Sequence, residues 1–129
     1  MNPSELDLYL DNIVEYLYHA TFTANLKNIK KYGLGGKTNQ LNWSDSLNDR
    51  VYLTIDAEMA YDFIMSIDNE DINDELFDDI TILKIDIKDL DKSKLFLDSN
   101  IIDNSGYSFE YHDIIPKEKL IIHKRIREN

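Results

Sequence analysis

The sequence predicts an α+β domain with a mixed or split β-sheet, and three observations support this fold class. The first half of the chain alternates helical periodicity with short apolar runs, at residues 3–15, 16–21, 51–55 and 57–67. The second half carries strand-like runs with no helix between them, which favours antiparallel pairing there. A length of 129 residues fits one core and no internal repeat is found, so residues 1–129 are interpreted as a single domain.

The N-terminal elements are expected to be a helix, a strand and a second helix. Residues 3–15 repeat apolar side chains at helical spacing. Residues 16–21 alternate as a strand does, and they place His19 within a short apolar run. Thr23 is then expected to cap a helix that ends at Gly33, with this glycine in the left-handed conformation.

A long polar loop that contains Trp43 is expected to separate this helix from the second strand. Residues 51–55 form that strand, and Asp56 is expected to cap the helix over residues 57–67. Apolar residues in this helix recur at helical spacing, which predicts one buried face. That face is expected to carry Met59, Ala60, Phe63, Ile64 and Ile67.

The C-terminal part is expected to consist mainly of strands. Their predicted ranges are residues 81–87, 94–97, 109–114 and 120–126. The loop over residues 97–108 contains an Asn-Ser-Gly turn signal. Because these strands follow one another without helices, they predict an antiparallel part of the sheet.

Composition and charge indicate a cytoplasmic protein without a membrane anchor. The chain has no cysteine, no apolar run near the roughly 20 residues that span a bilayer, and an acidic N-terminus. The net charge of −11 disfavours direct binding to nucleic acid. Residues 68–79 hold seven acids and no base, which fits either a solvated connection or a patch that faces a basic partner.

Four segments carry short motifs in a fixed order: YHAT at residues 18–21, GL at 33–34, VYLT at 51–54, and SFEY at 108–111 with IPKEKL at 115–120. In this order the motifs resemble those of the ADP-ribosyltransferase family of NAD-consuming toxins and small phage modifiers. The resemblance covers about residues 17–122. It implies an ADP-ribosyltransferase-like fold, with a split mixed β-sheet core flanked by short helices.

The resemblance implies a mono-ADP-ribosyltransferase that cleaves NAD and transfers ADP-ribose to a protein side chain. Cleavage of the nicotinamide–ribose bond passes through an oxocarbenium-like state that a carboxylate can stabilise. Glu110 matches the catalytic glutamate of the family, with Asp103 and Asp113 as rivals. Tyr107 and Ser108 match the target-recognition element, although a serine in that position leaves the modified side chain open.

The same resemblance assigns a set of residues to NAD binding. His19 matches the histidine that hydrogen-bonds a ribose, and Thr21 lies two residues further on. Tyr52 matches an aromatic side chain that stacks on nicotinamide, with Thr54 as a polar neighbour. Tyr61 is the second aromatic candidate, and Phe63 is its alternative because its spacing from Tyr52 fits the family better.

Several other functions stay open or are disfavoured. Water as acceptor would make the protein an NAD glycohydrolase. An acidic inhibitor that mimics nucleic acid and has no catalytic activity is a second alternative, whereas RNA 2′-phosphotransfer is disfavoured because arginines are scarce. His112 and His123 lack a second ligand at metal spacing, so no metal is expected. The expected partners are NAD and a protein target of basic character.

Overall fold

The computed structural model describes residues 15–35, 51–67, 73–97 and 108–128. The helix predicted over residues 3–15 lies outside these residues, apart from Glu15. Trp43, Asp103 and Tyr107 also lie outside them, so the predictions made for these residues stay predictions.

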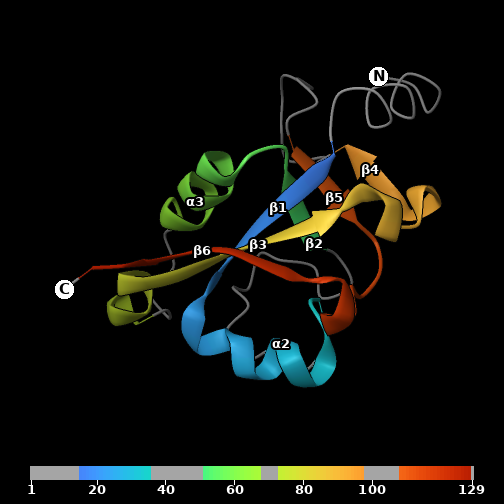
Figure 1. Cartoon of the computed structure of the whole chain (residues 1–129). Coiled ribbons are helices and arrows are strands. Elements are labelled where there is room, and N and C mark those ends of the chain that lie inside the picture. Colours follow the sequence, from blue (N-terminus) through green and yellow to red (C-terminus); the bar gives the residue numbers. More distant parts are fainter. Residues whose placement is uncertain (1–14, 36–50, 68–72, 98–107, 129) are drawn as a thin grey trace.

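Six strands of the described residues form one sheet in the order β4-β5-β2-β1-β3-β6 (Figure 1). Every neighbouring pair is antiparallel. The α+β class is therefore confirmed, but the prediction of a mixed sheet is wrong. A helix between two strands does not force parallel pairing when the connection is long enough to return in either direction. The strands are β1 (Tyr16–Phe22), β2 (Val51–Thr54), β3 (Asp79–Asp86), β4 (Leu95–Leu97), β5 (Ser108–Tyr111) and β6 (Ile121–Arg127).

The sheet consists of two half-sheets that meet between β1 and β2. β1 pairs with β3 along its whole length, from Tyr16↔Asp86 to Phe22↔Ile80. Towards β2, however, its register holds only one pair among the described residues, Tyr18↔Thr54. We call this contact between the β4-β5-β2 half-sheet and the β1-β3-β6 half-sheet the junction.

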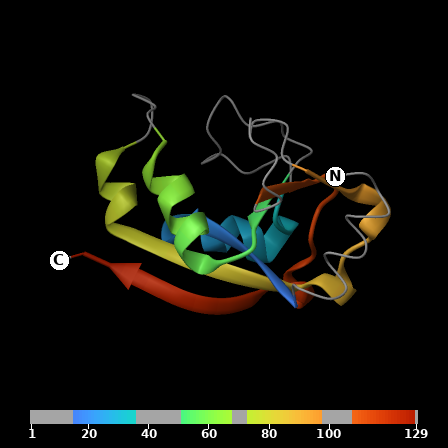
Figure 2. The same cartoon turned by 90° about the horizontal axis from the view of Figure 1, so that it is seen from above.

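Two helices cover opposite faces of the sheet, α2 (Leu26–Tyr32) and α3 (Ala57–Met65) (Figures 1 and 2). Each helix packs on its own hydrophobic core, one containing Ile29 and the other containing Ile64. Successive strand residues enter different cores, because side chains alternate across a sheet. The described residues also contain shorter 3₁₀ turns, at Thr23–Asn25, Asp74–Asp78, Ile87–Asp89, Lys92–Lys94 and Lys117–Lys119.

The start of α3 follows the prediction, whereas the start of α2 does not. The side chain of Asp56 accepts a hydrogen bond from the backbone N–H of Met59 at 2.7 Å, which confirms the predicted cap. Thr23 instead begins a 3₁₀ turn, and its hydroxyl lies 2.7 Å from the hydroxyl of Thr81. The residue that precedes α2 is Asn25, and no side chain caps this helix, so the predicted Thr23 cap is wrong.

Gly33 ends α2 and lets two of the motifs meet. Its φ of +83° is positive as predicted, but its ψ of 168° lies outside the left-handed helical region. A Cβ atom here would lie 2.6 Å from the side chain of Ile114 and 3.0 Å from the carbonyl oxygen of Ile115. Leu34 then pairs with Ile115 through two backbone hydrogen bonds of 2.9 and 3.0 Å. Glycine is therefore required where the GL and IPKEKL motifs touch.

Several predicted boundaries shift by a few residues. α3 ends at Met65, before the predicted end at residue 67, and β5 ends at Tyr111, before residue 114. The side chain of Asp113 accepts a hydrogen bond from the backbone N–H of Ile114 at 2.8 Å, which turns the chain away from the sheet. β3 ends at Asp86, because Ile87 already belongs to a 3₁₀ turn.

Candidate functional site at the junction

A pocket lies at the junction, on the face of the sheet that α3 covers. Its cavity volume is about 10 Å³, roughly the space of one water molecule, so a ring-sized ligand enters only if the lining side chains move. Three consecutive residues of β1 line it, together with residues of β2, α3 and β5. The pocket therefore lies where β1 and β2 keep one registered pair among the described residues. Its lining consists of Tyr18, His19, Ala20, Tyr52, Thr54, Ala60, Phe63 and Ser108.

His19 belongs to β1, and its side chain forms a hydrogen bond with β2 across the junction. Its Nδ1 atom lies 2.8 Å from the backbone carbonyl oxygen of Tyr52. A carbonyl can only accept, so Nδ1 carries the proton and Nε2 has the lone pair of an acceptor. Burial lowers the pKa of His19, and the hydrogen bond to Tyr52 only partly opposes this effect. The ring is therefore neutral at pH 7, and its Nε2 atom is suited to accept a hydrogen bond from a hydroxyl group.

Tyr18, Tyr52 and Phe63 are the aromatic residues that line the pocket, and the rings of Tyr52 and Phe63 are stacked. Their ring centroids lie 6.1 Å apart with an interplanar angle of 27°. Tyr61 does not line the pocket; it is half-buried against the core that contains Ile64. The helical repeat explains this difference, because Phe63 lies one turn from Ala60 and shares its face, while Tyr61 is rotated by about 100° from Ala60. The structure thus favours Phe63 over Tyr61 as the second aromatic.

The two aliphatic hydroxyls that line the pocket belong to a cross-strand pair, Thr54↔Ser108. The Thr54 hydroxyl donates to the backbone carbonyl of Asp56 at 2.7 Å, so part of its role is to shape the start of α3. Thr21 lies elsewhere. It is buried, and its hydroxyl lies 3.5 Å from the side-chain nitrogen of Asn25. The structure does not bring Thr21 to the pocket that contains His19.

Glu110 is a buried carboxylate next to this pocket. Its side chain is 5% exposed. It lies directly across from Tyr52 on one side and from Phe96 on the other, because β5 lies between β2 and β4. Ser108 shares its strand face, two residues earlier. The sheet therefore places Glu110 beside Tyr52, and Tyr52 in turn is bonded to His19.

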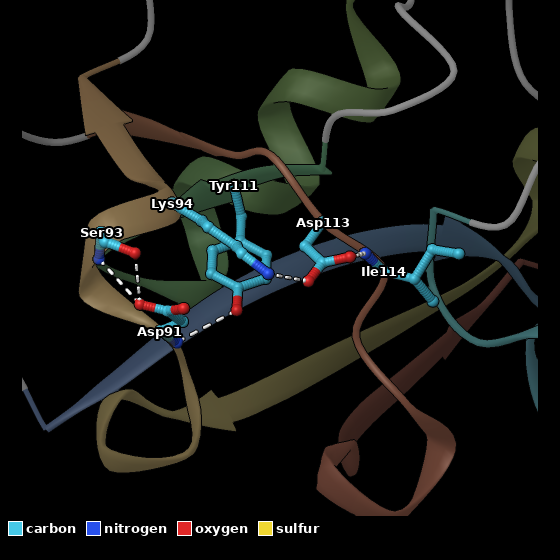
Figure 3. Close-up of polar contacts among 6 residues, drawn as sticks. All are labelled: Asp91, Ser93, Lys94, Tyr111, Asp113 and Ile114. Atoms are coloured by element: carbon cyan, nitrogen blue, oxygen red, sulfur yellow. Dashed lines mark hydrogen bonds and ion pairs between the residues drawn. The ribbon is translucent and has the colours of Figure 1, made fainter.

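The rival carboxylate Asp113 has a structural environment instead (Figure 3). One carboxylate oxygen of Asp113 lies 2.6 Å from the Lys94 ammonium, and the other accepts the backbone N–H of Ile114. The hydrogen bond with Lys94 is the main reason why the pKa of Asp113 is lowered. In the same view Asp91 receives hydrogen bonds from Ser93, and its backbone N–H donates to the Tyr111 hydroxyl at 3.0 Å. Asp113 thus fastens the end of β5 to the turn before β4.

The sequence interpretation missed one residue of the site, His112. Its Nε2 atom lies 3.1 Å from a carboxylate oxygen of Glu110. A spacing of two residues along an extended chain puts both side chains on one face, so the Glu-x-His pattern held this information. The sequence considered by metal-ligand spacing alone gives His112 no role, because no second ligand lies at that spacing.

Comparisons of the chain with protein-family models, curated proteins and solved structures found no match. Among the residues that the structure describes, no three histidine, cysteine, aspartate or glutamate side chains gather closely enough to hold a metal ion. Within the same residues, no helix has the length and apolar character needed to cross a bilayer.

Proposed function

We propose that the protein is a mono-ADP-ribosyltransferase that cleaves NAD at the junction and transfers ADP-ribose to a protein side chain. One observation carries the proposal. Tyr52 accepts a hydrogen bond from His19 through its carbonyl and is the cross-strand neighbour of Glu110. Three segments that are far apart in the sequence thus supply a ring acceptor, an aromatic ring and a buried carboxylate at one place.

Each of the three groups has a task in this chemistry. The nicotinamide ring stacks beside Tyr52 and Phe63, whose flat faces suit a planar cation, once the small pocket widens to admit it. Nε2 of His19 accepts a hydrogen bond from a ribose hydroxyl. Glu110 stabilises the positive charge that develops on the ribose as the bond to nicotinamide breaks.

The reaction conserves atoms and charge. The bond between C1 of the ribose and the nicotinamide nitrogen breaks, and nicotinamide leaves with the electron pair. The acceptor side chain forms a bond to the same carbon and releases its proton to water. With water as acceptor the same steps give ADP-ribose, so the proposed transferase and an NAD glycohydrolase differ only in the nucleophile.

The net charge favours a protein target of basic character over a nucleic acid. NAD is a co-substrate in this scheme, and no step needs a metal ion.

Saturation-transfer NMR with NAD tests the pocket before any target is known. We expect NAD to receive saturation from the wild-type protein and to bind more weakly to His19→Ala. A nicotinamide-release assay then tests cleavage by comparing the wild type with Glu110→Gln. Glu75→Gln, which changes an exposed glutamate elsewhere in the chain, is the matched control. Labelled NAD is also incubated with the protein in a cell lysate, and transfer is shown if a protein of the lysate acquires the label.

No binding at millimolar NAD would contradict the proposal and favour the acidic inhibitor. Nicotinamide release without a labelled protein would favour the glycohydrolase.

A further inference from the structure

The role proposed for Glu110 requires that its carboxylate be held in one orientation. A glutamate side chain has three rotatable bonds, and a carboxylate that stabilises a developing charge must already point at it. Nε2 of His112 lies 3.1 Å from Oε1 of Glu110, and His112 directly follows the end of β5. An ionised carboxylate can only accept a hydrogen bond, so Nε2–H is the donor in this pair.

His112 is itself held by the edge strand β4 and the turn before it. Its backbone N–H donates to the carbonyl of Lys94 at 2.8 Å, which prolongs the pairing beyond the end of β5. Its ring lies against Phe96, with centroids 4.5 Å apart and an interplanar angle of 35°. The side chain is 31% exposed, whereas the Glu110 side chain is almost completely buried. His112, held through its backbone and through its ring, is thus a hydrogen-bond partner of the buried carboxylate.

We propose that His112 is a positioning residue for Glu110. The hydrogen bond from Nε2 fixes Oε1 and so sets the plane of the carboxylate, while the ring contact with Phe96 sets the plane of the imidazole. His112 forms no bond with NAD and exchanges no proton with it in this role. The inference rests on the proposed function, because the carboxylate that His112 orients is the one that acts on NAD there.

Two substitutions separate the hydrogen bond from the ring contact. His112→Gln keeps an N–H donor near the position of Nε2 but loses the aromatic ring. His112→Phe keeps a ring against Phe96 but has no donor. If the hydrogen bond matters, His112→Gln retains most of the wild-type kcat for nicotinamide release, and His112→Phe loses roughly tenfold to hundredfold. The Kd for NAD stays within about twofold in both variants, because His112 does not line the pocket.

The opposite order of activities, or equal loss in both variants, would overturn the inference. A second measurement does not depend on activity. NMR couplings of the Glu110 side chain should report one rotamer in the wild type and in His112→Gln, and averaged rotamers in His112→Phe. If the wild-type protein releases no nicotinamide, the proposed function fails. The couplings then still decide about His112, and unaveraged couplings in His112→Phe would refute the positioning role.

Discussion

β1 has two neighbours in the sheet, and it is bonded to them very differently. Towards β3 all seven of its residues are in register, and the strand residues on both faces of this ladder are largely apolar and buried. Towards β2 it keeps one registered pair within the described part of the chain, and His19 and the pocket lie at this junction. The edge of β1 that faces β3 is therefore fully paired, whereas the edge that faces β2 leaves polar groups accessible.

This difference indicates how a small domain combines stability with a polar site. Buried polar groups cost free energy unless they are paired, so they are best placed where the ladder is already interrupted. At the junction the carbonyl of Tyr52 bonds to an imidazole of the opposite half-sheet. We therefore expect substitutions in the β1–β3 ladder to change stability, and substitutions at the junction to change activity.

The largest expected effect is that of Glu110→Gln on catalysis. The substitution keeps the size of the side chain but removes the negative charge that stabilises the developing cation. We expect kcat for nicotinamide release to fall about 10²–10³-fold. The melting temperature of the variant, measured beside it, provides the control for folding. Unchanged release from a folded Glu110→Gln protein would remove Glu110 from the mechanism.

The second effect concerns the ladder and should be of the opposite kind. Ile85 is fully buried and lies across from Leu17 in the β1–β3 pairing. Ile85→Ala removes apolar contacts and leaves a cavity, so we expect the free energy of unfolding to fall by about 2–5 kcal/mol. Urea denaturation followed by circular dichroism measures this change. A loss below about 1 kcal/mol would mean that the ladder does not carry the stability that its burial implies.

Local sequence patterns predicted most elements but not how they are assembled. Alternation within residues 16–21 and 81–87 was enough to predict β1 and β3, because side-chain direction is a local property. The antiparallel order and the single pair at the junction depend on contacts between distant segments, which periodicity does not encode. Gly33 was predictable as a helix end, whereas its ψ of 168° and the pairing of Leu34 with Ile115 that follows it were not.

The candidate site was predictable to a similar extent. The sequence motifs predict Tyr52 and Ser108 as site residues, and the sheet brings both to the pocket. Thr21 was chosen with them, but its hydroxyl lies near Asn25 instead. His112 was missed because its importance appears only when the partner on the same face, Glu110, is considered as a buried group.

A smaller effect should appear in the pH dependence of stability. The pKa of His19 is lowered from 6.5 in the folded protein, chiefly by burial. The unfolded chain therefore binds a proton more readily, so His19 favours folding above pH 6.5 and this contribution is lost as the pH falls below it. We expect the free energy of unfolding of the wild type to decrease from pH 7.5 to pH 5.5 by more than that of His19→Gln. Urea denaturation at several pH values tests this, and parallel curves for the two proteins would contradict it.

The smallest effect is expected where a charged pair lies at the surface. Lys94 and Asp113 are each 44% exposed, and exposed pairs contribute about 0–1 kcal/mol because water screens them. Asp113→Asn keeps an oxygen that can accept the backbone N–H of Ile114, so the turn after β5 is preserved. We expect a loss of at most about 1 kcal/mol in the free energy of unfolding, and unchanged nicotinamide release. A large loss of release with intact stability would instead identify Asp113 as the reacting carboxylate, and the contrast between this structural carboxylate and Glu110 would have to be reversed.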